Sequence, residues 1–134
     1  MERIYQKIGR IREYRSQVQA MEADCIRLFS TDAIYRGALL HYLYLLADSC
    51  VALAELVIKH KGFRLPQSYH EAFDVLGENR IIDPAFAQDF AKIAGFRNFL
   101  AHDYEQVDAP FICNHILPRL ADVENFLRQI EDKL

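Results

Sequence analysis

The sequence predicts an all-α fold, a bundle of four to five helices that run up and down, and three observations support this prediction. Apolar residues recur at helical spacing along the chain, and no segment shows the strict apolar–polar alternation that is typical of a strand. Cap residues and prolines separate the periodic segments. The length of 134 residues fits a single domain, 1–134, with one core.

The first two periodic segments predict long helices. Residues 2–28 are charged and amphipathic, and the cluster Ser30-Thr31-Asp32 that follows them offers an N-cap for the next helix. Residues 32–60 carry two adjacent apolar stripes, which together make a face too wide for a helix that packs on one neighbour. We therefore expect this helix to lie at the centre, against several helices or a second subunit. Gly62 follows as its C′ residue.

Two helices with clear start signals are expected next. Ser68 and Glu71 have the spacing of a capping box, which opens a short helix. The pair Asp83-Pro84 supplies a cap and a first-turn proline for a longer helix, which we expect to run to about His102.

The last helix is expected after a polar stretch at residues 103–107. Asp108 and Pro110 supply its start signals. Pro118 lies inside this helix and has no backbone N–H, so it should kink or split the helix.

Composition and charge favour a cytoplasmic protein without a membrane segment. The N-terminus is charged and helix-periodic, unlike a signal peptide. The longest apolar stretch, around residues 38–47, is too short to span a bilayer. The net charge of −3 argues against a protein that coats nucleic acid by bulk charge, but it is compatible with an enzyme that grips a few phosphates.

The cysteines and histidines show no pattern of a disulfide framework or a metal site. The three cysteines are far apart and form no CxxC pair. Cys25 and Cys50 fall on apolar helical stripes, where we expect reduced thiols in the core. We expect no metal and no cofactor. Four histidines lack ligand spacing and are expected to be ordinary polar or core residues: His41, His60, His70 and His115.

The segment FRNFLAHDY, residues 96–104, carries side chains suited to chemistry rather than to packing. Arg97 offers a permanent charge and a planar set of donors that suit phosphate. His102 can exchange protons near neutral pH. Together they suit the cleavage of a phosphodiester without a metal. The alternative interpretation is that both residues are cations that stabilise the C-terminal end of a helix.

Helix geometry sets a condition on this pair. Side chains five residues apart on an ideal helix point about 140° away from each other. Arg97 and His102 converge only if the helix unwinds near Ala101 or if a second subunit completes the site. We expect both.

At this point the chain resembles a known family. The residues RNFLAHDY match the R-x4-H-x-Y motif of HEPN ribonucleases, and the rest of the chain is similar to the HepT-like branch of that family. The likeness includes the apolar helix after Arg36 with Asp48 inside it, the segment RLPQSYHEAFDVLGENRII, and the final amphipathic helix. The resemblance implies a HEPN-type bundle that forms homodimers. It also implies a metal-independent endoribonuclease, the toxin of a type VII HepT/MntA toxin–antitoxin module.

The resemblance further implies roles for single residues and a partner. Arg97 and His102 belong to the catalytic centre, and Asn98 orients the histidine or contacts the RNA substrate. Tyr104 is the site at which an MntA-like nucleotidyltransferase antitoxin adds AMP, and this addition neutralises the toxin because it places bulk and negative charge where a phosphate must lie. The dimer could also assemble further with the antitoxin.

Several of these residues have structural interpretations that stay open. Asp48 either pairs with an arginine to fix the helix register or orients Arg97 or His102. Without the resemblance, Tyr104 would be interpreted as an interface tyrosine. Four arginines are expected to be solvated or paired with nearby acidic residues, or else to form an RNA track on the dimer surface: Arg10, Arg12, Arg15 and Arg36.

Two other functions compete with the nuclease. One is a non-catalytic accessory module that binds nucleotide or holds a nucleotidyltransferase partner, and the other is a plain dimeric scaffold. The intact pair of Arg97 and His102 favours the nuclease, since a scaffold has no need of it.

Overall fold

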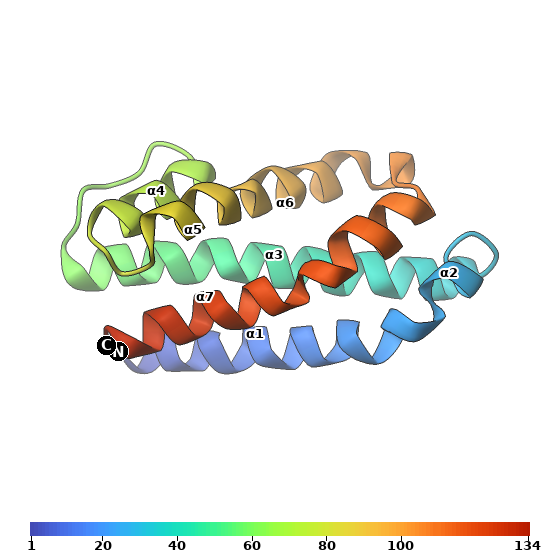
Figure 1. The fold of residues 1–134 in the computed structure, drawn as a ribbon, viewed down its shortest axis with the longest axis horizontal. Helices are drawn as coiled ribbons and strands as arrows, with labels where there is room; N and C mark the ends of the chain where they lie inside the picture. Colours follow the sequence, from blue (N-terminus) through green and yellow to red (C-terminus); the bar gives the residue numbers. More distant parts are fainter.

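The computed structural model describes residues 1–134 except for the side chain of Tyr104, and the described residues form helices and turns without a strand. This confirms the all-α prediction. Figure 1 shows the long helices running alternately up and down, with the two termini side by side. The elements in order are α1 (Glu2–Met21), η1 (Glu22–Asp24), α2 (Cys25–Leu28), α3 (Ala33–Lys61), α4 (Tyr69–Glu78), α5 (Pro84–Phe90), α6 (Lys92–Asp103), η2 (Tyr104–Gln106), η3 (Phe111–Ile116), η4 (Leu117–Arg119) and α7 (Leu120–Asp132).

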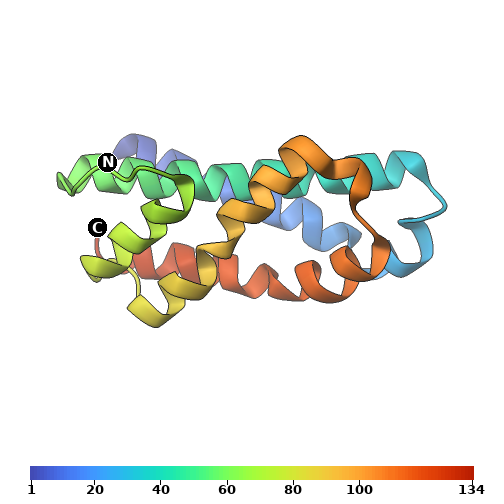
Figure 2. The ribbon, with the colours of Figure 1, turned by 90° about the horizontal axis from the view of Figure 1, so that it is seen from above.

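Helix α3 lies at the centre of the bundle, as predicted. It packs against α1, α4 and α6, and Figure 2 shows α6 reaching across to it. Leu39, Leu53 and Val57 are completely buried on this helix. By length and composition alone α3 could also cross a membrane, but contacts on several sides are typical of the central helix of a globular bundle.

The predicted caps are present. The side chains of Asp32, Ser68 and Asp83 each accept hydrogen bonds from backbone N–H groups in the first turn that follows them. Gly62 ends α3 with a φ of 72°, a left-handed conformation that favours glycine. Pro84 occupies the first turn of α5. These local signals fix where the helices begin and end.

Two of the predicted helices are interrupted. The first segment divides into α1, η1 and α2. The helix that was expected to run from Pro84 to His102 breaks at Ala91 into α5 and α6. Helix α6 then continues to Asp103, so the expected unwinding near Ala101 is wrong.

The last helix is split, as the proline inside it predicts. A π-helical turn, η3, and a 3-10 turn, η4, precede α7. Pro118 lies in η4, where its missing N–H costs no regular α-helical bond. Asp108 accepts a hydrogen bond from the backbone N–H of Phe111 and so caps η3.

Two arginines join α1 to the C-terminal segment, contrary to the expectation that they pair with acidic residues nearby in sequence. Arg12 forms ion pairs with Glu124 at 2.9 Å and with Glu131 at 2.7 Å. Arg15 donates to the backbone carbonyl of Leu120. The expectation fails because α7 packs beside α1, and a periodicity analysis does not show which helices become neighbours. Of the other two, Arg10 lies near Glu13 and Arg36 donates to the carbonyl of Phe29.

The prediction of a reduced Cys25 is also wrong. Cys25 and Cys113 form a disulfide that ties α2 to η3, with their Cα atoms 5.7 Å apart. The two residues are separated by 88 positions in the sequence, so no local spacing could indicate the bond. Cys50 is a buried free thiol, as expected, and burial raises its pKa.

Candidate functional site

Arg97 reaches from α6 to α3, where its guanidinium is held by hydrogen bonds. Its Nε donates to the Asp48 carboxylate at 2.9 Å and its Nη2 donates to the Tyr44 hydroxyl at 3.0 Å. Its Nη1 donates to the side-chain oxygen of Asn98 at 3.1 Å. The bond to Asp48 favours the charged form and raises the pKa of Arg97. The site therefore holds a fixed positive charge.

The contact with Asp48 answers the question that the sequence left open. Asp48 ties α6 to α3 and at the same time orients Arg97, so the register and the orienting interpretations describe one ion pair. The Arg97 side chain is 18% exposed and that of Asp48 is 44% exposed. Solvent, and hence a ligand, can reach this pair.

Two tyrosines complete the surroundings of Arg97. The ring centroid of Tyr44 lies 5.3 Å from the Arg97 Cζ, and that of Tyr69 lies 5.0 Å from it. Tyr44 comes from α3 and Tyr69 is the first residue of α4. The sequence analysis missed both. Tyr44 precedes Asp48 by one helical turn on α3, a signal that could have found it, whereas Tyr69 approaches from a different helix and gave no local signal.

His102 does not join Arg97 within one protomer. It lies exposed in the last turn of α6. Because α6 stays helical through Asp103, the separation of about 140° expected for an ideal helix applies to this pair. Among the side chains that the structure describes, none forms a hydrogen bond or ion pair with His102. Of the two expected conditions for convergence, only completion by a second copy is left.

Of the other two predicted site residues, the structure describes the side chain of Asn98 but not that of Tyr104. Asn98 accepts its bond from Arg97 rather than contacting His102, so its expected role in orienting the histidine is not seen in the protomer. The side chain of Tyr104 lies outside the described part of the chain, so its role stays a prediction.

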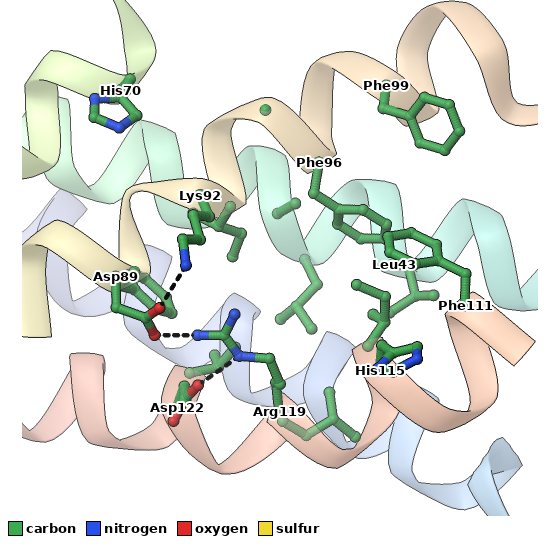
Figure 3. A pocket seen from close by; sticks show the side chains of 18 residues that line it. Leu43, His70, Asp89, Lys92, Phe96, Phe99, Phe111, His115, Arg119 and Asp122 are labelled. Carbon is green, nitrogen blue, oxygen red and sulfur yellow. Dashed lines mark hydrogen bonds and ion pairs between the residues drawn. The ribbon is translucent and has the colours of Figure 1, made fainter.

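A cavity of about 590 Å³ borders α6, but Arg97 and His102 are not among its described lining residues. Its walls come mainly from apolar side chains such as those of Leu43, Phe96, Phe99 and Phe111 (Figure 3). The charged groups at its edge neutralise each other, since Arg119 pairs with Asp89 and Asp122, and Lys92 also pairs with Asp89. Chemically, the cavity suits an apolar group and offers no unbalanced charge for a phosphate.

The side chains that the structure describes include no group of three or more histidine, cysteine, aspartate or glutamate residues close enough together to hold a metal ion.

Comparison with known proteins identifies the family of this chain. The family described as Ribonuclease HepT-like matches residues 4–130. The chain is 23% identical over 128 residues to the mRNA nuclease HepT of Shewanella oneidensis, a match that covers 96% of both proteins.

Solved structures show the same fold. A mutant of the toxin–antitoxin pair MntA-HpeT contains a chain that superposes with a TM-score of 0.84 at 25% identity, over 98% of this chain and 99% of that one. A tri-AMPylated Shewanella oneidensis HEPN toxin in complex with MNT antitoxin gives a TM-score of 0.81 at 23% identity, over 96% of each chain. This protein therefore belongs to the ribonuclease HepT-like family and has the HEPN toxin fold.

Proposed function

We propose that this protein is a metal-independent endoribonuclease of the cytoplasm, the toxin of a type VII toxin–antitoxin module of the HepT/MntA kind. The observation that carries the proposal is the Arg97 guanidinium, which is charged, held in place and open to solvent in a chain of the HepT-like family. Similarity to an mRNA nuclease over 96% of the chain supports RNA as the substrate.

The donors of Arg97 fit a phosphate. A guanidinium has five N–H groups, and three of them donate to Asp48, Tyr44 and Asn98. Among the described contacts, one N–H is left on each terminal nitrogen. Each of these two groups can donate to an oxygen of a phosphate. In the proposed reaction the RNA 2′-hydroxyl loses its proton and attacks the adjacent phosphorus. The bond from phosphorus to the 5′-oxygen of the next nucleotide breaks, that oxygen takes up a proton, and the products are a 2′,3′-cyclic phosphate and a 5′-hydroxyl. Arg97 stabilises the negative charge that develops on the phosphate oxygens.

His102 supplies the proton transfer in this proposal, as general base or general acid. Since it points away from Arg97 on its own helix, we propose that the protein works as a homodimer in which His102 of one copy approaches Arg97 of the other. A two-fold dimer forms two such composite sites, because each contact between the copies occurs twice.

A cleavage assay tests the proposal. Purified wild-type protein should cut RNA in the presence of EDTA, and Arg97→Ala and His102→Ala should not, while their circular dichroism stays that of the wild type. Expression of the wild-type chain alone should arrest bacterial growth, and His102→Ala should restore it. Cleavage that is lost on addition of EDTA, or that persists in both variants, would contradict the proposal.

We further propose that an MntA-like nucleotidyltransferase antitoxin neutralises the protein by adding AMP to Tyr104. The support is the similarity to an AMPylated toxin that was solved with its MNT antitoxin. The intact mass of the chain after co-expression with such a partner should rise in steps of AMP. The steps should disappear in Tyr104→Phe. An unchanged set of mass steps in that variant would place the modification on another residue.

A second candidate function is favoured by one observation. In the single protomer Arg97 and His102 do not converge, which is also expected of an accessory module that binds nucleotide or holds a nucleotidyltransferase without cleaving RNA. Equal growth of cells that express the wild type or His102→Ala would favour this function, whereas arrest by the wild type alone favours the nuclease.

A further inference from the structure

We propose that Tyr44 and Tyr69 are positioning residues for Arg97: Tyr44 acts through its hydroxyl as well as its ring, and Tyr69 through its ring alone. This inference rests on the proposed function, since it concerns how the phosphate-binding arginine is held. Neither tyrosine belongs to the R-x4-H-x-Y segment, and they come from two helices, α3 and α4.

The contact with Tyr44 is a hydrogen bond. Its hydroxyl oxygen lies 3.0 Å from Nη2 of Arg97. Its ring centroid also lies 5.3 Å from Cζ, so Tyr44 adds a hydrogen bond to a ring contact. The neighbouring donor, Nε, bonds to Asp48. Two adjacent N–H groups along one edge of the guanidinium are thus occupied. Two bonds on one edge restrain the rotation of the plane, which a single bond would permit. With Asn98 bound to Nη1, one N–H is left on each terminal nitrogen for a phosphate.

The contact with Tyr69 is of another kind. Its ring centroid lies 5.0 Å from Cζ of Arg97, and no hydrogen bond joins the two described side chains. At that distance the ring attracts the cation through its quadrupole. An aromatic ring holds an arginine without adding a negative charge, whereas a second carboxylate beside Asp48 would make the site net negative. Arg97 can therefore still donate to a phosphate while its position is fixed.

The start of α4 keeps Tyr69 in place. Ser68 caps the helix by accepting a hydrogen bond from the backbone N–H of Glu71 at 3.0 Å. The preceding loop is tied to the same helix by Arg64, which pairs with Glu71 and with Glu78. Tyr69 itself is 38% exposed. Because it is exposed, its substitution should leave the core intact.

Because only Tyr44 contacts Arg97 through its hydroxyl, removal of the hydroxyl should lower activity at Tyr44 and not at Tyr69. Tyr44→Phe should lower the kcat for RNA cleavage roughly tenfold, because a hydrogen bond to the charged group is lost. Tyr69→Phe should match the wild type, and Tyr69→Leu should lower kcat roughly tenfold, because the ring contact is lost. KM should change little, since a displaced arginine chiefly weakens stabilisation of the transition state. Melting temperatures close to that of the wild type would show that the variants are folded.

A second measurement does not depend on activity. The Nε–Hε signal of Arg97 in an NMR spectrum can be identified by its loss in Arg97→Lys. Tyr69→Leu should shift this signal because the ring current is removed, and Tyr69→Phe should leave it in place. Wild-type kcat in Tyr69→Leu together with an unshifted signal would overturn the inference. If the wild-type protein cleaves no RNA, the proposed function fails, and the NMR shift alone decides whether the ring holds Arg97.

Discussion

The two sides of α6 differ in size and in chemistry. On one side Arg97 meets Asp48 and Tyr44 in a small polar contact that is open to solvent. On the other, Phe96 and Phe99 face the cavity of about 590 Å³, whose edge charges neutralise each other. The Arg97–Asp48 pair is also balanced in charge, but among the described contacts Arg97 keeps one N–H free on each terminal nitrogen, whereas the larger hollow is lined mainly by apolar side chains. The proposed site of RNA cleavage therefore rests on the free donors of an arginine and not on the volume of a cavity.

The largest effect should come from the substitution of Arg97, compared with a substitution on the cavity side of α6. Arg97→Ala should reduce RNA cleavage by about a hundredfold or more, because the charge that stabilises the transition state is lost. The matched control is Phe99→Leu, which changes the cavity wall and should retain most of the activity. Initial rates on one RNA substrate measure both. A larger loss in Phe99→Leu than in Arg97→Ala would reverse the assignment of the two sides.

The disulfide should matter for stability and not for the site. The disulfide between Cys25 and Cys113 joins α2 to η3 and closes a loop of 88 residues. Its removal should lower the free energy of unfolding by about 4–5 kcal/mol in the chain-entropy model. Urea unfolding of the wild type with and without dithiothreitol measures this difference, and Cys25→Ser serves as the control that dithiothreitol cannot change. Cleavage by the folded reduced protein should stay near the oxidised rate. A reduced form that is folded but inactive would show that the disulfide and the site are coupled.

Glycine-to-alanine substitutions should change stability in opposite directions on α4, which carries Tyr69, and on α6. A Cβ at Gly77 would lie 2.9 Å from the Cβ of Ala87, so α4 and α5 would have to move apart. Gly77→Ala should therefore lower stability by about 1–3 kcal/mol. Gly95 on α6 has no heavy atom within 4 Å of its added Cβ. Gly95→Ala should stabilise the protein by up to about 1 kcal/mol. Thermal unfolding gives both values, and equal signs for the two variants would contradict the packing described here.

The smallest effect is a pH dependence of stability at the contact between α1 and α7. Arg12 on α1 lowers the pKa of Glu131 on α7 through their hydrogen bonds. A carboxyl whose folded pKa lies below its unfolded value, about 4.3, stabilises the protein above that value. This stabilisation is lost as the pH falls through the folded pKa.

Arg12→Gln should therefore lose less stability than the wild type when the pH is lowered from about 5 to about 3, by less than about 1 kcal/mol, because the pair is partly exposed. Denaturation curves at the two pH values measure the difference. Identical pH profiles for the two proteins would show that the pair contributes nothing to stability.

Local sequence signals predicted much of the fold. The caps at Asp32 and Ser68, the left-handed Gly62 and the wide apolar face of α3 each depend on residues a few positions apart, and all were confirmed. Contacts between distant segments were not predictable in this way. The Cys25–Cys113 bond depends on which helices become neighbours, which periodicity does not specify.

The same distinction between local signals and distant contacts applies to the candidate site. Asp48 and Arg97 were named from the sequence, and the structure brings them together. Tyr69 was missed because it enters from the start of a third helix. The end of α6 was expected at about His102, close to the observed end at Asp103. The unwinding expected near Ala101 does not occur, and residues 96–103 contain no glycine or proline that would break the helix. That continuation is what makes a second copy of the chain necessary for the proposed chemistry.

A mixture of two inactive variants tests this requirement most directly. Arg97→Ala and His102→Ala proteins are unfolded together, refolded to form mixed dimers, and assayed for RNA cleavage beside each variant alone. If Arg97 of one copy acts with His102 of the other, each mixed dimer contains one intact site and activity should reappear. If mixed dimers form, as shown by mass spectrometry, but cleave no faster than either variant alone, the shared site is contradicted.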